Sequence, residues 1–193
     1  MEIDRFQIIP DQVILDWIIP KDFVHSETGM LVGFLRLLKE KREILIEVNE
    51  ERMVEHKARG ARIAVFDNIG PMITLDSISF EKLYAKGNKD DLFILFHEVG
   101  HYMCGHFESP LSEEEVAMER VKCILSGEVW HEELEADRYA ARMIGIQPAI
   151  DGLKQMMRES SQKDMDAGYF GDESWMLTMR DYMNRIKALE SLA

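Results

Sequence analysis

The sequence is poor in cysteine and has no long apolar run. It contains two cysteines, Cys104 and Cys123, among 193 residues, which is too few for a disulfide framework and favours a reducing compartment. No uninterrupted apolar stretch approaches the ~20 residues that cross a bilayer as a helix. The opening residues, MEIDRFQIIPDQ, carry acidic side chains and a proline where a signal peptide has a basic end and an apolar run. We therefore expect a soluble, cytoplasmic protein with no membrane partner.

Basic residues are the minority among the charged ones. Lys and Arg number 23 against 36 Asp and Glu, which gives a formal net charge of −13. Such an acidic surface repels phosphate backbones, so we expect no nucleic-acid partner. Apolar residues make up 46% of the chain and charged residues 31%, the composition of a globular protein with a buried core. The sequence has no internal repeat and no low-complexity linker, so we expect one domain over residues 1–193.

The N-terminal part of the chain divides into three segments. Residues 1–26 alternate short apolar clusters with prolines, and we interpret them as an irregular or short-strand arm. Residues 27–60 place apolar side chains largely on one helical face, which predicts a long helix that ends at Gly60. The segment ARIAVFDNIGPMITLDS, which begins at Ala61, holds two β-rich runs around a turn and predicts a hairpin.

The rest of the chain is predicted to be helical. Apolar periodicity, caps and terminating glycines predict helices over residues 91–104, 113–125, 130–145, 147–157 and 174–192. The second of these begins with a capping box from Ser112 to Glu115. We therefore expect an α+β fold, with a mostly helical core over 61–145, one small β-sheet next to the helix over 91–104, and C-terminal helices over 146–193.

Two histidines and a glutamate interrupt an apolar helix in LFILFHEVGHYMC. His97 and His101 are four residues apart, so both imidazoles lie on one helix face and can reach one metal ion. Glu98 lies about 100° round the helix, where it can take a proton from a water molecule beside the metal. Burial of these polar side chains in a core helix costs free energy unless hydrogen bonds or a metal ion compensate. Gly100 costs roughly 1 kcal/mol relative to Ala inside a helix, which makes sense if another element approaches closely.

A catalytic zinc needs a third protein ligand, and the segment HEELEADRYAA supplies carboxylates. On a helix, Glu133 and Asp137 are one turn apart and share a face with Ala136 and Ala140, whose small side chains allow a close approach. Glu133 is the predicted third ligand. Asp137 is the predicted acceptor for the outer N–H of a zinc-bound histidine. Glu135 is the rival ligand, disfavoured because it faces away from Asp137.

Five further polar residues lie where they could assist the site. His106 is interpreted as a helix-end cap in preference to a ligand. His131 could donate a hydrogen bond to an oxyanion, although an exposed histidine is the favoured interpretation. Cys104 is interpreted as a packed thiol, with inhibitory zinc ligation as the alternative. Arg180 and Arg185 could reach a carbonyl group in the active site, but surface salt bridges are favoured for both.

The HExxH motif at His97–His101, followed by ExxAD at Glu133–Asp137, resembles the gluzincin metallopeptidases. Soluble ImmA/IrrE-like proteases have a similar HExGH helix and a downstream ExEA segment. The prenyl-protease and heat-shock membrane metallopeptidases are more similar in EADRYAA and in the late RIKAL segment. The resemblance covers roughly Ile73 to Gly145 and implies the zincin core, in which the edge strand of a small sheet binds substrate beside the active-site helix. The gap between the motifs departs from it, because it holds an extra helix and a cysteine.

The motifs and the resemblance together imply a zinc-dependent endopeptidase. One Zn²⁺ per chain would be held by His97, His101 and Glu133. Glu98 would take a proton from water and return it to the leaving amine. The substrate would be a protein or peptide, and the ImmA/IrrE-like resemblance suggests a regulatory protein such as a repressor. The alternative is a catalytically silent zincin-fold binding protein, encoded by a mobile element or phage.

Overall fold

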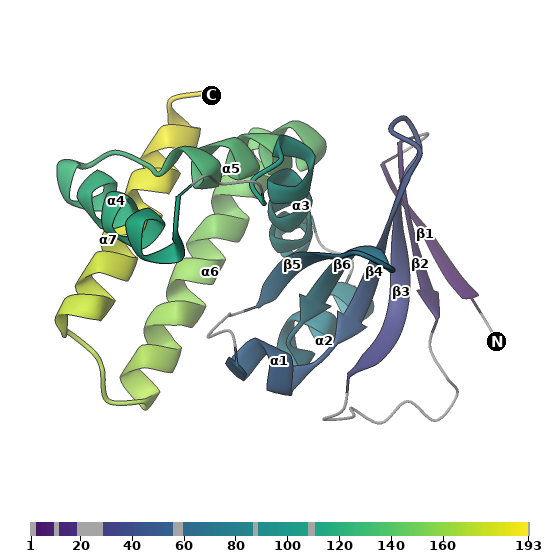
Figure 1. The fold of residues 1–193 in the computed structure, drawn as a ribbon, viewed down its shortest axis with the longest axis horizontal. Coiled ribbons are helices and arrows are strands. Elements are labelled where there is room, and N and C mark those ends of the chain that lie inside the picture. The colour runs from purple at the N-terminus through teal and green to yellow at the C-terminus, as the bar shows by residue number, and fades with distance from the viewer. Residues whose placement is uncertain are drawn as a thin grey trace. The chain divides into compact units, whose positions relative to one another are not determined.

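The computed structural model describes residues 3–9, 12–18, 29–55, 60–86, 89–107 and 111–192. Contacts divide the chain into two compact units, Met1–Gly87 and Asn88–Ala193. In the described residues, the first unit holds a β-sheet with two short helices, and the second unit is built from helices (Figure 1). The predicted α+β class is confirmed. The single metallopeptidase domain over 1–193 stays a prediction.

A six-stranded mixed sheet forms most of the first unit. Its strands are β1 Ile3–Ile9, β2 Val13–Ile18, β3 Met30–Leu37, β4 Arg42–Val48, β5 Ala61–Phe66 and β6 Gly70–Leu75. Their order in the sheet is β1-β2-β3-β4-β6-β5. Neighbours pair antiparallel except β4 and β6, which run parallel. Helix α1 Glu50–Glu55 follows β4, and helix α2 Ser77–Lys86 follows β6. The sheet is larger than the small one predicted, and its predicted place next to the active-site helix stays a prediction.

Two of the predicted segments at the sheet are strands as expected. The hairpin predicted after Ala61 is confirmed, because β5 and β6 pair antiparallel with Ile63 opposite Ile73. The short-strand interpretation of the N-terminal arm is confirmed for β1 and β2, which also pair antiparallel. On β2, Val13, Leu15 and Trp17 are buried at every second position, the period of a strand with one face in a core. The remaining residues of the arm lie outside the described residues.

The long helix predicted over residues 27–60 is wrong. Strands β3 and β4 form an antiparallel hairpin in this segment, and only α1 is helical among its described residues. Residues 27–28 and 56–59 lie outside the part of the chain that the structure describes.

The pattern in β4 shows why a sheet forms here. Ile44, Ile46 and Val48 are buried on alternate positions, and β-branched residues with a period of two favour a strand. An exposed turn over residues 38–41 separates the strands, and Lys41 has a φ of 52°, which a helix interior does not allow. Apolar residues spaced three or four apart in β3 and β4 imitated a helical face.

Five helices form the described part of the second unit. They are α3 Lys89–Cys104, α4 Glu113–Ser126, α5 His131–Ile144, α6 Ile146–Asp166 and α7 Glu173–Glu190. The capping box of α4 is confirmed, with Ser112 and Glu115 bonded reciprocally. Helix α6 extends beyond the predicted 147–157. The predicted helix stops before the polar residues that follow Met157, but Ser160 and Asp164 are buried one turn apart on the same helix.

Among the described helices, none has both the length and the apolar character needed to cross a membrane.

Candidate metal centre

Helix α3 presents His97 and His101 on consecutive turns of one face. Its apolar side chains Phe93, Phe96 and Val99 are completely buried, so the helix is fixed by its core contacts. His97 is buried and His101 is half-buried. The two imidazole rings meet edge to face, with their centroids 4.7 Å apart. The core side of the helix therefore positions both rings before any ligand binds.

Gly100 allows α5 to approach α3 closely. A Cβ atom at Gly100 would lie 2.7 Å from the Cα and 2.9 Å from the backbone oxygen of Ala136. Ala136 and Ala140 are completely buried. The close approach that the sequence predicted is confirmed, and it brings Glu133 and Asp137 of α5 to the histidines of α3.

Three ligand atoms converge between α3 and α5. His97 Nε2 lies 3.1 Å from His101 Nε2 and 3.4 Å from Glu133 Oε2. One ligand atom from each of these residues lies within 4.8 Å of the other two. Tetrahedral ligands about 2.0–2.1 Å from a zinc ion are about 3.3 Å from one another. The two measured distances are close to that separation.

The outer nitrogens of both histidines contact proton acceptors. His97 Nδ1 lies 2.9 Å from Asp137 Oδ1. His101 Nδ1 lies 2.8 Å from His106 Nδ1, and His106 Nε2 lies 2.9 Å from Glu135 Oε2. When His106 donates from Nε2 to Glu135, its Nδ1 can accept from His101. Both His97 and His101 then carry a proton on Nδ1 and direct an unprotonated Nε2 at the shared point.

The lone pairs of His97 Nε2 and His101 Nε2 face one another and repel unless a cation lies between them. In the metal-free chain, a proton can be that cation. Burial acts to lower the pKa of His97, but hydrogen bonds to Asp137 and Glu133 outweigh it and raise the pKa to about 9. Burial and the neighbouring His97 lower the pKa of His101 to about 3. A divalent cation in place of the proton would meet two imidazoles and one carboxylate, which is the donor set of a catalytic zinc site.

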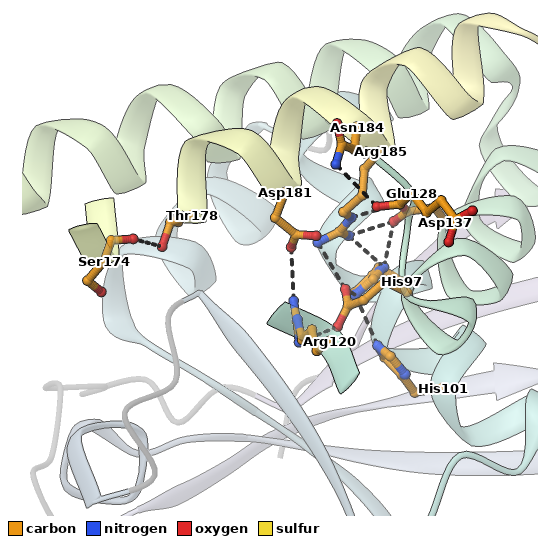
Figure 2. A network of polar contacts seen from close by, with 11 residues as sticks. His97, His101, Arg120, Glu128, Asp137, Ser174, Thr178, Asp181, Asn184 and Arg185 are labelled. Carbon is orange, nitrogen blue, oxygen red and sulfur yellow. Dashed lines mark hydrogen bonds and ion pairs between the residues drawn. The ribbon is translucent and has the colours of Figure 1, made fainter. Parts of the chain in front are cut away.

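Two arginines pair with the carboxylates of α5. Arg185 of α7 donates from Nε and Nη2 to the two oxygens of Asp137, at 2.8 and 2.7 Å. Its Nη1 lies 2.9 Å from Glu133 Oε2. Arg120 of α4 bridges Glu133 Oε1 at 2.9 Å and Asp181 Oδ2 at 3.0 Å. Figure 2 shows Arg185 directed from α7 at both Asp137 and His97.

The arginines keep the acidic residues charged in spite of their burial. Burial acts to raise the pKa of Glu133 and of Asp137, but the Arg185 charge opposes it, and the pKa of each carboxyl is lowered. Burial acts to lower the pKa of Arg185, but Asp137 and Glu133 raise it. Glu133 is therefore available as an anionic ligand, and Asp137 as an anionic acceptor for His97.

The other predicted residues lie outside the group of His97, His101 and Glu133. Glu98 is half-buried on α3 and is not one of the three converging ligands, consistent with its position off the metal-facing side of the helix. Glu135 is exposed and contacts His106. His131 is exposed and its ring lies 4.3 Å from that of Trp130. Arg180 is exposed and donates to a backbone oxygen of the α4 end.

Two of the sequence interpretations are wrong. Cys104 is exposed, so it is not a packed thiol. Arg185 is 4% exposed and pairs with buried carboxylates, so it does not form a surface salt bridge. His106 does lie at the helix end, where its backbone N–H donates to His101 O, and its ring also contacts the His101 ring.

Sequence reasoning missed Arg120 and Asp181. Asp181 lies one turn before Arg185 in α7, and this spacing could have indicated a charged face that turns inward. Arg120 gave no such signal, because α4 is acidic and largely exposed.

No protein-family model, curated protein or solved structure matches this chain. The gluzincin resemblance therefore stays a prediction that rests on the two motifs. Support for the candidate site comes from its own geometry.

Proposed function

We propose that this protein is a zinc-dependent endopeptidase that acts in the cytoplasm. The observation that carries the proposal is the convergence of His97 Nε2, His101 Nε2 and a Glu133 oxygen. Contacts to Asp137 and His106 favour the tautomer in which both Nε2 atoms are free to bind a metal. A purely structural ion-pair network has no need for two imidazoles in this arrangement.

The chain's own residues have separate roles in this proposal. His97, His101 and Glu133 hold the ion, which when bound polarises a peptide carbonyl and lowers the pKa of water. Glu98, next to His97 on α3, takes the proton of the attacking water and returns it to the leaving amine. Asp137 holds the His97 ring by its Nδ1–H. Zinc suits this group of ligands because it binds nitrogen and oxygen donors in tetrahedral geometry.

The substrate proposed is a protein or a peptide. A regulatory protein such as a repressor is suggested by the ImmA/IrrE-like resemblance alone, and resemblance in fold is weak support for a substrate. The net charge of −13 disfavours nucleic acid as a partner.

A catalytically silent binding protein is the second candidate. The observation that favours it is the pairing of Glu133 and Asp137 with Arg120 and Arg185, because these ion pairs satisfy both carboxylates without a metal. In that case Glu98 would have no chemical role, and its replacement would change no activity.

The test is hydrolysis of a peptide library by the full chain, with and without chelator, in parallel with Glu98→Gln. We expect chelator-sensitive cleavage that falls about 10²–10⁴-fold in Glu98→Gln, the usual loss of a general base, while zinc content stays unchanged. Glu132→Gln is the matched control, since it makes the same change beside the ligand Glu133 but outside the ligand group. Cleavage that survives chelator, or equal rates for Glu98→Gln and the wild type, would refute the proposal.

A further inference from the structure

A second group of side chains that could hold a metal ion lies beside the first. One ligand atom from each of Cys104, His106 and Glu135 lies within 4.8 Å of the other two. Cys104 is the last residue of α3, and His106 follows it after one glycine. Gly105 has a φ of 77°, a value that favours glycine, and the turn it makes brings His106 back toward His101. Glu135 comes from α5, so the group spans the same two helices as the first site.

One side chain of this group is buried and the other two are open to solvent. The His106 side chain is 7% exposed and the Glu135 side chain is 53% exposed. Cys104 is exposed as well. The imidazole is held from one side by His101, while the thiol and the carboxylate can reach an ion that arrives from solution. A thiolate, an imidazole and a carboxylate form a donor set suited to zinc, cobalt or cadmium and poorly suited to magnesium or calcium.

We propose that Cys104, His106 and Glu135 bind a second thiophilic divalent cation, and that this ion weakens binding at His97, His101 and Glu133. The proposal of a second site depends only on the three ligands of that site. Its effect on the first site rests on the proposed function, because it presumes that a metal binds there.

Binding at the second site releases one proton. Burial and the Glu135 carboxylate raise the pKa of the Cys104 thiol, so the free thiol is protonated at neutral pH. The incoming cation displaces this proton to solvent and forms a bond to sulfur. Glu135 binds as an anion and His106 binds as a neutral imidazole through Nε2. The Nε2–H···Glu135 hydrogen bond of the free chain is lost. The Nε2 proton leaves to solvent and Nδ1 takes up one proton, so the neutral His106 keeps a single ring proton, now on Nδ1.

This new proton position carries the effect to the first site. His106 Nδ1 faces His101 Nδ1 at 2.8 Å, and this contact is a hydrogen bond only if one of the two nitrogens is unprotonated. In the free chain we assign His101 as the donor, because His106 Nδ1 is unprotonated when His106 donates from Nε2 to Glu135. Once His106 becomes the donor, His101 must accept at Nδ1 and carry its proton on Nε2. An Nε2–H cannot bind the first ion, so the two sites compete through one hydrogen bond.

The first experiment is a Co²⁺ titration of the full chain already loaded with one equivalent of Zn²⁺. The expected result is a near-ultraviolet thiolate-to-cobalt absorbance that saturates at one further equivalent in the wild type and is lost in Cys104→Ala. Cys123→Ala is the matched control and should keep the absorbance, because Cys123 lies outside the group. No thiolate absorbance in the wild type, or a loss in Cys123→Ala with retention in Cys104→Ala, would overturn the second site.

The second experiment measures coupling. Chelator competition gives the zinc affinity of the first site with and without Cd²⁺, which serves as the thiophilic probe. We expect Cd²⁺ to weaken that affinity by about tenfold or more, within the usual range for coupled sites, in the wild type and in Cys123→Ala but not in Cys104→Ala. Equal weakening in Cys104→Ala, or none in the wild type, contradicts the coupling.

Failure of this inference is distinguishable from failure of the proposed function. In His97→Ala, where the first site is disabled, the thiolate absorbance with Co²⁺ should persist, because none of its ligands is changed. Absorbance in His97→Ala with no zinc bound by the wild type would remove the proposed function and leave the second site standing. Loss of the absorbance in His97→Ala would overturn a second site that stands on its own ligands.

Discussion

Proton positions on a few residues decide what the cluster can bind. His97 and His101 direct Nε2 at each other across 3.1 Å, and their Nδ1 atoms contact Asp137 and His106. Each outer contact fixes one tautomer, as the hydrogen-bond partners of metal-bound histidines usually do. Asp137 is completely buried, whereas the His106 contact depends on the exposed Glu135. The His97 tautomer is therefore the more firmly held of the two.

The relative importance of three acidic residues follows from these contacts. We predict that zinc affinity, measured by chelator competition, falls most for Glu133→Ala, which removes a ligand. Asp137→Ala should lose about 10–100-fold, the usual effect of a lost histidine partner. Glu135→Ala should lose least, because it acts through His106 at an exposed position. Loss of the metal in Glu135→Ala with retention in Glu133→Ala would mean that the third ligand is assigned to the wrong face of α5.

Arg185 is predicted to be essential for stability. Arg185→Met leaves Asp137 and Glu133 buried without their main counter-charge, and breaking a buried ion pair from one side costs about 3–5 kcal/mol. Urea unfolding of the metal-free chain measures this change in the free energy of unfolding. Arg180→Met is the matched control on the same helix, because Arg180 is exposed, and it should change the value by less than about 0.5 kcal/mol. Similar losses for both variants would contradict the assigned role of Arg185.

The sequence was sufficient to predict that His97, His101 and Glu133 converge and that Asp137 contacts a histidine of this group, but not the other groups around them. Spacing on one helix face identified His97, His101 and Glu133, because residues one turn apart must share a face. Arg120 and Arg185 come from α4 and α7, and their approach to α5 depends on tertiary packing that periodicity does not encode. The contact of His106 with His101 could not be predicted without knowing the turn at Gly105.

The contact between α3 and α5 is the element that assembles the site. Its closeness depends on Gly100 in α3 and on Ala136 and Ala140 in α5, all of which have little or no side chain. The atoms that a Cβ at Gly100 would meet belong to the backbone of Ala136, which cannot rotate away as a side chain could. The two helices would have to separate, and with them the ligands that each carries.

Gly100→Ala is therefore predicted to destabilise the chain. Alanine has a helix propensity about 1 kcal/mol better than glycine, but overpacking costs typically 1–3 kcal/mol. We expect a net loss in the free energy of unfolding, measured by urea, together with weaker zinc binding. Arg158→Ala, at an exposed position within α6, should leave both quantities nearly unchanged. A more stable Gly100→Ala variant would show that the helices do not meet as closely as described.

Elements of the first unit were harder to predict than those of the second. The helices α3, α4, α5 and α7 have caps, terminating glycines or clear apolar faces, and each lies close to its predicted range. The sequence of the β3 and β4 hairpin predicts a helix, because its leucines satisfy a helical spacing as well as a strand period. Pairing of distant strands decides between the two, and it is a property of the sheet, not of the local sequence.

At the scale of the molecule, every ligand of the proposed site comes from the unit Asn88–Ala193. The chain carries a net charge of −13, and such a field raises the local concentration of cations. An ion that binds the folded chain and not the unfolded one stabilises it by about 2.7 kcal/mol at one hundred times its dissociation constant. The molecule as a whole should therefore be more stable with zinc than without it.

The zinc content per chain decides whether His97, His101 and Glu133 hold a metal ion. It is measured by elemental analysis on full-length protein purified without added metal and without chelator, in parallel with His97→Ala, Glu133→Ala and Cys104→Ala. We expect one zinc per chain in the wild type and in Cys104→Ala, and little in the two ligand variants. No stoichiometric transition metal in the wild type, or equal zinc in all four proteins, would contradict it.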